Sequence, residues 1–304
     1  MVEASHVLSG QHAGRLDHVW ADGPRFTPRT PRVVAARRLH RRRDREATGR
    51  FLAEGPQAVR EALTVAGGVH ELFGTDDALR RHDDLVAAAV AAGVPVSPVT
   101  DDGLAALTET VAPQGVVAVC AQRHVPLATA LARAPRLVAV LAEIRDPGNA
   151  GTVLRTADAA GAGAVVFAGD AVDPYNGKCV RATAGSLFHL DLVRDGDPFA
   201  VVAALRAAGL TVFAATGYGD TDLDELADAD LAATPGGTPR GLARPTAWLF
   251  GSEAHGLPPE LAAAADARVR VPLHGRAESL NLAAAAAVCL YASARALRSR
   301  EPRR

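Results

Sequence analysis

In the second half of the chain, short apolar segments alternate with segments of helical periodicity. Apolar runs of about five residues without polar alternation are typical of strands buried on both faces. Parallel neighbours among such strands need connections long enough for a helix. We therefore predict an α/β fold with a mostly parallel sheet covered by helices on both faces. The predicted strands span residues 137–141, 164–167, 188–192, 210–214, 246–250 and 268–271, and the main helices span 152–160, 198–208, 259–264 and 279–297.

The 304 residues leave room for two domains, each with its own core. Residues 1–30 lack periodicity and are predicted to be a poorly ordered extension. A smaller α/β domain is predicted over residues 31–123, with helices at 76–92 and 101–108. Residues 124–135 form a linker with a short helix, and residues 136–304 form the larger domain. Within the latter, residues 217–244 are rich in Asp, Gly and Pro and are predicted to be a mobile surface loop.

The charge pattern limits how the chain can bind nucleic acid. The net charge is −1, and Lys178 is the only lysine among 33 basic residues. A uniformly basic surface is therefore excluded, and any RNA contact must come from local patches. Residues 37–50 hold seven arginines; they form either a solvated helical face or a phosphate contact, and Lys178 and Arg181 form a second, smaller basic site. The candidate RNA-binding residues are Arg41, Arg42, Arg43, Arg45, Arg50, Lys178 and Arg181.

Cysteine usage and hydropathy indicate the compartment. Cys120, Cys179 and Cys289 are far apart and belong to no metal-binding spacing, so we expect neither a metal site nor a disulfide. The first residues are polar and lack the apolar core of a signal peptide. The apolar stretch at 282–294 is too short to span a bilayer. We expect a cytoplasmic protein with no membrane contact.

The first of three motifs, residues 149–155, follows the strand at 137–141. On the simpler interpretation Asn149 caps a helix and Arg155 lies on its solvated face. The alternative uses the same geometry: a helix N-terminus favours a phosphate, and Arg155 can add a charge-assisted contact to it.

The second motif, Gly251-Ser-Glu253-Ala-His-Gly256, directly follows the strand at 246–250. It is either a plain turn with an exposed acid or a point where Gly251 lets the backbone approach a ligand. In the second case Glu253 can hold a neighbouring polar side chain. His255 is assigned no role.

The third motif joins Val271-Pro-Leu273 to Glu278-Ser279-Leu280-Asn281 at the start of the final helix. Ser279 is a candidate N-cap for this helix. Asn281 falls in the predicted first turn, where it would be half-buried and would need a partner. An active-site hydrogen bond is a candidate for that partner.

Two competing glycine patterns fail. Gly161-x-Gly163 lacks the third glycine of a dinucleotide fingerprint and precedes a strand, and Gly177-Lys178 lacks the rest of a phosphate loop. A nucleotide-dependent oxidoreductase is therefore disfavoured.

The three motifs, in this order and after these strands, resemble the SpoU/TrmH family of SPOUT methyltransferases, which act on the ribose 2′-hydroxyl of RNA. Residues 49–59 also resemble the start of that family's L30e-like substrate-binding domain, and residues 180–188 resemble a stretch between its first two motifs. The resemblance implies a C-terminal SPOUT domain with a deep trefoil knot, S-adenosylmethionine as cofactor, and a homodimer.

Matched position by position, the resemblance also implies roles for individual residues. Val271-Pro-Leu273 departs slightly from the more usual Ile-Pro-Met, in a site that works through backbone. In this family an arginine at the position of Arg155 has been proposed as a base, but a guanidinium is too weak an acid to lose its proton easily, which favours a clamp on phosphate or on the developing alkoxide. The implied catalytic residues are Asn149, Arg155, Glu253, Ser279 and Asn281, and the implied cofactor-binding residues are Thr216, Gly217, Gly251, Val271, Leu273 and Leu280.

The expected function is therefore methylation of RNA at the ribose 2′-oxygen. Ribosomal RNA, 23S in particular, is favoured over transfer RNA, because a separate RNA-binding domain suits a structured rRNA element. The alternatives are a tRNA 2′-O-methyltransferase and a catalytically inactive RNA-binding protein of the same fold.

Overall fold

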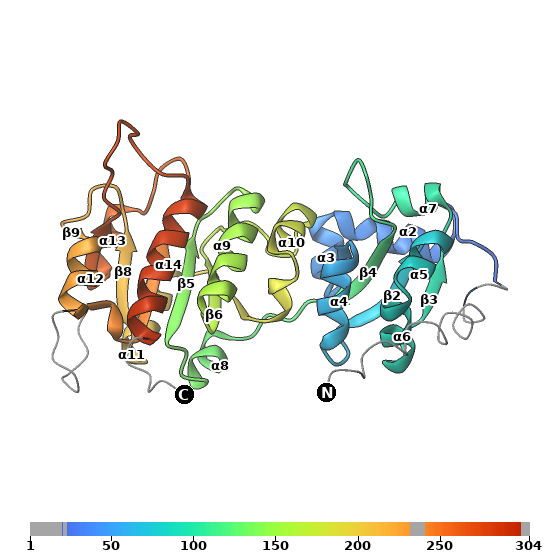
Figure 1. The fold of residues 1–304 in the computed structure, drawn as a ribbon, viewed down its shortest axis with the longest axis horizontal. Coiled ribbons are helices and arrows are strands. Elements are labelled where there is room, and N and C mark those ends of the chain that lie inside the picture. Colours follow the sequence, from blue (N-terminus) through green and yellow to red (C-terminus); the bar gives the residue numbers. More distant parts are fainter. Residues whose placement is uncertain (1–19, 21–22, 232–240, 299–304) are drawn as a thin grey trace, which may run out of the picture. The chain divides into compact units, whose positions relative to one another are not determined.

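The structure is a computed structural model (Figure 1), and it describes residue 20, residues 23–231 and residues 241–298. The chain forms two compact units. The first contains residues 1–122 together with Tyr175–Phe188, and the second contains the remainder. Most of the predicted N-terminal extension, residues 1–19 and 21–22, lies outside the described residues. Residues 23–30 are described, and Phe26 forms a β-bridge with Val99.

The first unit is built on a four-stranded sheet with the order β1-β4-β2-β3. The central strand β4 pairs antiparallel with β1 and β2, while β2 and β3 are parallel. Five of the six residues of β4 are buried. The strands are β1 (Arg50–Glu54), β2 (Val69–Gly74), β3 (Val96–Pro98) and β4 (Val116–Ala121), and the helices are α2 (Pro31–Arg37), η2 (Arg38–His40), α3 (Arg42–Thr48), α4 (Pro56–Thr64), α5 (Asp76–Arg81), α6 (Asp83–Ala91), α7 (Asp101–Ala105), α10 (Gly177–Thr183) and η3 (Ser186–Phe188).

The second unit contains a seven-stranded sheet with the order β7-β6-β5-β10-β8-β11-β9. Every strand pair in it is parallel, which confirms the predicted sheet. The strands are β5 (Leu137–Ala142), β6 (Ala164–Ala168), β7 (Asp191–Asp195), β8 (Thr211–Ala215), β9 (Thr221–Asp222), β10 (Thr246–Phe250) and β11 (Ala267–Arg270). The helices are α8 (Leu127–Ala132), α9 (Pro147–Ala160), α11 (Pro198–Ala207), α12 (Leu223–Leu231), η4 (Gly241–Ala243), α13 (Pro259–Ala264) and α14 (Leu282–Arg298).

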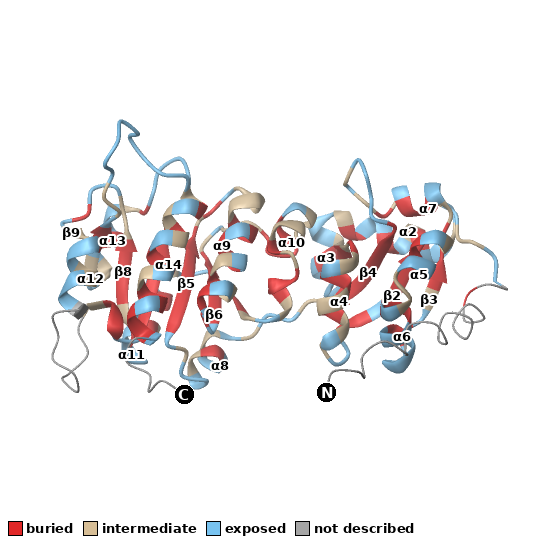
Figure 2. Ribbon diagram, viewed as in Figure 1, coloured by how far each residue is buried: buried red, intermediate tan, exposed pale blue. Residues whose placement is uncertain are grey.

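Helices cover this sheet on both faces, so its neighbouring strands β6, β5 and β10 are buried along their whole length (Figure 2), whereas β7, β9 and β11 are only partly buried. Ala247 and Leu249 of β10 belong to the core that α8, α11 and α13 complete. The alternate residue Trp248 faces α14, where its indole N–H donates to the Ser293 hydroxyl at 2.9 Å. Burial on both faces explains why β10 is apolar along nearly its whole length.

Two helices begin at different residues from those predicted. Helix α9 begins at Pro147, because the Asp146 carboxylate accepts from the Asn149 backbone N–H at 2.8 Å and caps the helix. Asn149 is thus inside the first turn. Helix α14 begins at Leu282, because the Asn281 side chain accepts from the backbone N–H groups of residues 283 and 284.

The prediction of a long loop over residues 217–244 was wrong in part, because this segment contains β9, α12 and η4. Ion pairs tie its start to β11: Arg268 binds Asp220, and Arg270 binds Asp222. Residues 232–240 of the predicted loop lie outside the described residues. In the first unit, the helix predicted over 76–92 is divided into α5 and α6 at His82, whose backbone leaves the helical region.

The segment Tyr175–Phe188 belongs to the first unit, although its sequence lies within the larger predicted domain. Its aromatic residues pack on Phe51 of β1, with ring centroids 4.8 Å away for Tyr175 and 6.0 Å away for Phe188. The two units are therefore discontinuous in sequence, whereas the sequence predicts a single boundary. The knot expected from the resemblance stays a prediction.

Gly219 gives a test of the packing beside β11. An added Cβ there would lie 2.6 Å from the Arg270 backbone nitrogen, so Gly219→Ala should lower the free energy of unfolding by about 1–3 kcal/mol. A Cβ at Gly217 would meet nothing within 4 Å, so Gly217→Ala is the matched control and should stay within about 0.5 kcal/mol of the wild type. Denaturant unfolding measures the stability of both variants. Equal stability of the two would contradict the close packing of Gly219 against the backbone of β11.

Candidate active site

Three loops meet at the carboxyl edge of the seven-stranded sheet. They follow β5, β10 and β11, and their polar residues come from all three sequence motifs. In a parallel sheet these strand ends lie on the same edge, which is where ligands bind in open α/β folds.

The carboxylate of Glu253 joins two of these loops. It accepts hydrogen bonds from the backbone N–H groups of Arg145 and Asp146, both at 3.3 Å, and from the Asn149 side chain at 3.1 Å. Glu253 is separated from these residues by more than a hundred positions in sequence. The predicted role of Glu253, holding a neighbouring polar side chain, matches this geometry.

The hydrogen bonds to Glu253 stabilise its charged form. Partial burial alone would raise the pKa of this carboxyl group. The bonds from Asn149 and from the backbone N–H groups of residues 253, 145 and 146 outweigh burial, so that the pKa of Glu253 lies below its ordinary value.

Asn281 brings the third loop into the network. Its side-chain N–H donates to the Asn149 side-chain oxygen at 3.2 Å, while its own oxygen caps α14. Asn281 is exposed, so the prediction that it is half-buried was wrong; the helix begins after it and leaves it at the surface. The predicted need for a polar partner was nonetheless met. Glu253, Asn149 and Asn281 thus form one hydrogen-bonded chain.

Gly251 is required by the packing of its own loop, while the approach of a ligand at this position stays a prediction. A Cβ at this buried position would lie 2.1 Å from the carbonyl carbon of Gly256. The turn from Ser252 to Gly256 is closed by two backbone hydrogen bonds of 3.0 and 2.8 Å, which bring Gly256 back against Gly251. Gly251 therefore shapes the loop that carries Glu253.

The predicted cofactor-binding residues other than the buried Gly251 are at least partly accessible. The Thr216 backbone N–H donates to the Val269 carbonyl oxygen at 2.9 Å, and Thr216 Oγ1 is buried without a hydrogen-bond partner in the described chain. Leu273 and Leu280 expose 41% and 38% of their surface, and Tyr218 exposes 96%. Within residues 23–231 and 241–298, the backbone N–H groups of Leu273 and Leu280 have no acceptor.

Arg155 and Ser279 are exposed and do not join the hydrogen-bonded chain. Arg155 follows Asn149 by six residues in α9, which places it about 9 Å further along the helix axis. Its guanidinium makes no hydrogen bond or ion pair with the residues that the structure describes. Within one chain Arg155 is thus not linked to the other motif residues by hydrogen bonds, and its implied catalytic role stays a prediction.

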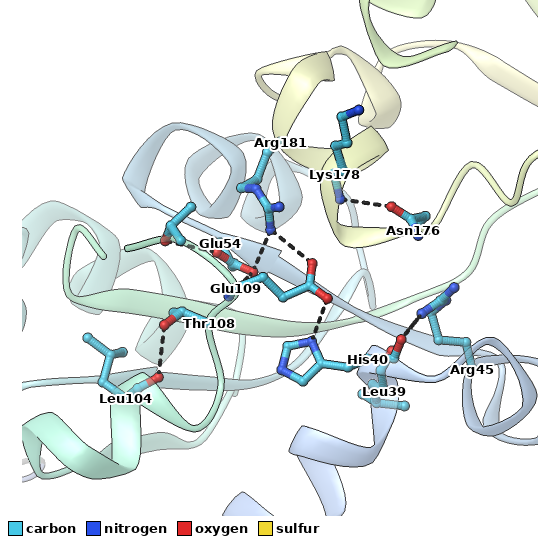
Figure 3. A network of polar contacts seen from close by, with 11 residues as sticks. Leu39, His40, Arg45, Glu54, Leu104, Thr108, Glu109, Asn176, Lys178 and Arg181 are labelled. Atoms are coloured by element: carbon cyan, nitrogen blue, oxygen red, sulfur yellow. Dashed lines mark hydrogen bonds and ion pairs between the residues drawn. The ribbon is translucent and has the colours of Figure 1, made fainter. Parts of the chain in front are cut away.

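The candidate RNA-binding arginines fall into two groups in the structure. Arg41, Arg42, Arg43 and Arg50 are exposed, and Arg42 pairs with Glu46 one turn later in α3. Arg45 is only 3% exposed, and its guanidinium donates to the carbonyl oxygens of residues 39 and 40 (Figure 3). We therefore withdraw Arg45 from the RNA-binding set, because it satisfies buried backbone groups.

Arg181 is also held by the protein itself. Its guanidinium bonds Glu54 at 2.9 Å and Glu109 at 3.2 Å, and the Glu54 side chain is only 7% exposed (Figure 3). This pair anchors α10 to β1. An RNA phosphate would have to compete with two carboxylates at Arg181, whereas Lys178 of the same helix is exposed.

Sequence reasoning missed the part that residues 145 and 146 play. Their backbone N–H groups bind Glu253, and the Asp146 side chain caps α9. The signal was present, since an Asp directly before Pro147 is a typical helix start.

The comparisons with known proteins agree with this α/β fold. The model of the SpoU rRNA Methylase family matches residues 136–291, and that of the MRM3-like substrate binding domain matches residues 30–118. The 23S rRNA (guanosine(2553)-2′-O)-methyltransferase RlmP of Bacillus subtilis is 35% identical over 255 residues, which cover 84% of this chain and 92% of the relative. The chain therefore belongs to the SpoU rRNA methylase family.

Two solved structures extend the likeness to the whole fold. An S-adenosylmethionine-bound rRNA methyltransferase from Sinorhizobium meliloti is 32% identical with a TM-score of 0.73, covering 90% of this chain and 97% of that one. The SpoU methyltransferase AviRb from Streptomyces viridochromogenes, also with its cofactor, is 29% identical with a TM-score of 0.73, covering 89% and 100%.

Replacing Glu253 tests the hydrogen-bonded chain. Glu253→Gln loses the charge and one acceptor oxygen, so the free energy of unfolding should fall by about 1 kcal/mol at about pH 7. Because the pKa of Glu253 is lowered by folding, its stabilisation is present above the unfolded pKa and is lost as the pH falls through the folded pKa. The difference from wild type should thus shrink at about pH 3.

Thermal melts at both pH values check this, with Glu260→Gln on the exposed surface of α13 as the control. A difference between wild type and Glu253→Gln that grows on acidification would contradict the assigned role.

Proposed function

We propose that this protein transfers a methyl group from S-adenosylmethionine to a ribose 2′-hydroxyl of 23S ribosomal RNA. The observation that carries the proposal is the hydrogen-bonded chain through Glu253, Asn149 and Asn281. It fixes three loops at the carboxyl edge of the sheet, beside exposed apolar side chains. RlmP, a relative named as a 23S rRNA 2′-O-methyltransferase, supports the substrate class, and AviRb, solved with its cofactor, shares the fold.

The residues at this edge fit the proposed cofactor. Thr216 Oγ1 is a buried polar atom without a partner in the described chain, and the N–H groups of Leu273 and Leu280 are free to donate. The exposed side chains of Leu273 and Leu280 suit an apolar ligand surface. Val271, Gly217 and Gly251 complete the set that would hold S-adenosylmethionine.

The cofactor would supply an electrophilic methyl group, and the protein would supply positioning and charge. Arg155 would clamp a phosphate or the developing alkoxide of the ribose, because an exposed guanidinium stays charged. Asn149 and Asn281 would hold the loops in place relative to one another. Ser279 would lie beside the backbone that holds the cofactor.

A homodimer would complete the site. Helix α14 presents Val288 and Tyr291, which expose 44% and 50% of their surface, one turn apart on one face. Such an exposed apolar stripe is typical of an interface. In a dimer, Arg155 of one chain would reach the site of the other, which accounts for its separation from the network within a single chain.

RNA would bind the first unit through exposed cations. Arg41, Arg43 and Arg50 and the single lysine Lys178 are exposed, and their positive charges would contact phosphates. A separate substrate-binding domain favours a structured rRNA element over transfer RNA.

The proposal is tested by incubating the protein with labelled S-adenosylmethionine and total RNA from cells lacking it. Alkali-resistant ribose positions should map to 23S rRNA. Methylation confined to tRNA would redirect the substrate assignment, and failure to bind S-adenosylmethionine in calorimetry would overturn the proposal.

Substitution of Arg155 tests its role as a clamp. Arg155→Lys keeps the charge and should retain part of the activity with a shallow pH–rate profile, while Arg155→Ala should lose about 10²-fold or more. Initial rates and RNA binding are measured for both variants. Complete loss in Arg155→Lys without weaker RNA binding would contradict the clamp.

The interface on α14 is tested by Tyr291→Arg. A charge in the apolar stripe should yield a monomer by light scattering, with methyl transfer reduced in parallel. Phe199→Arg is the control, because Phe199 is 48% exposed on α11 in the same unit. A dimer that persists in Tyr291→Arg would contradict this interface.

A further inference from the structure

Helix α9 carries a carboxylate next to Arg155. Asp158 follows Arg155 by three residues, and side chains at this spacing are neighbours on a helix surface. An Arg and an Asp so placed normally attract one another. In the structure, however, Asp158 makes its ion pair elsewhere.

Asp158 is engaged by His189, which precedes β7. The His189 Nδ1 atom lies 2.8 Å from Asp158 Oδ2, and the two side chains are 39% and 26% exposed. The other carboxylate close to His189 in sequence, Asp191, is paired with Arg133. His189 and Asp158 both belong to the second unit.

The consequence for Arg155 is that its nearest acidic neighbour on the helix is occupied. Arg155 has no hydrogen bond or ion pair with any described residue. An Asp158 released from His189 would attract the guanidinium and could also bring its negative charge closer to an incoming phosphate. Both effects oppose the binding of an anion at Arg155.

We infer that His189 is a positioning residue, which holds Asp158 so that the Arg155 guanidinium stays available to RNA. This inference rests on the proposed function, because it assigns Arg155 to the substrate. It adds two residues, His189 and Asp158, that none of the three motifs contains.

The test is a double-mutant cycle on methyl transfer to total RNA with labelled S-adenosylmethionine. His189→Ala should lower the initial rate about 2- to 5-fold, the range expected when an exposed ion pair competes for Arg155. His189→Asn should retain activity, because its amide N–H can take the place of Nδ1. Asp158→Asn should retain activity too, since an amide at residue 158 does not compete for the guanidinium.

The decisive variant is the double substitution of His189→Ala with Asp158→Asn, which should restore the wild-type rate. A purely structural link between α9 and β7 predicts the opposite, with Asp158→Asn as harmful as His189→Ala and no rescue in the double variant. Either that pattern or an unchanged rate in His189→Ala overturns the inference.

Two reference measurements in the same assay distinguish a failure of this inference from a failure of the proposed function. Wild-type activity that is lost in Arg155→Ala, together with a failed rescue, counts against the role of His189 alone. An inactive wild type overturns the proposed function and this inference with it.

Discussion

The carboxylate of Glu253 is the interaction on which the candidate site depends. It accepts from two backbone N–H groups and one side-chain amide in a segment more than a hundred residues away. Hydrogen bonds to an ionised group are stronger than neutral ones, so a single side chain can fix the start of α9 against the loop after β10. Asn281 then adds the start of α14 through Asn149. The geometry of the three loops therefore depends on one charged acceptor. Gly251 and Gly256 allow the tight turn that carries this carboxylate.

The parallel sheet explains why such distant segments can meet. Strands β5 and β10 are direct neighbours in register, although more than a hundred residues separate them. Their carboxyl ends lie on one edge, and each is followed by a loop that carries polar residues. Burial on both faces leaves the edge as the place where polar side chains of this unit can gather without a desolvation cost.

The sequence predicts most strands of the larger sheet, because five-residue apolar runs between helices have few alternative structures. It places β7 three residues too early, at 188–192, and misses the two-residue β9. It predicts helix starts poorly where two residues can serve as the cap, as with Ser279 and Asn281, and only tertiary contacts choose between them. For α9 the sequence did offer a signal, since Asp146 directly precedes Pro147. The segment Tyr175–Phe188 could not be assigned, because its aromatic packing on Phe51 depends on a fold that periodicity does not reveal. Likewise the pairing of Arg181 depends on Glu54 and Glu109, which are distant in sequence, and the burial of Arg45 depends on tertiary packing. In the site, the sequence identifies Glu253, Asn149 and Asn281 but not the backbone donors that complete the network.

The arginines of this chain have different roles, and the acceptors around each guanidinium determine which role it has. A guanidinium is always charged, so what it can do depends on which acceptors already surround it. Arg45 satisfies backbone carbonyl oxygens and Arg181 lies between two carboxylates, and both thereby stabilise the first unit. Arg155 keeps its donors available even though Asp158 lies one turn away, because that carboxylate is held by His189. In a chain with this many arginines, the absence of a competing acid therefore separates a residue that can meet an RNA phosphate from one that holds the fold together.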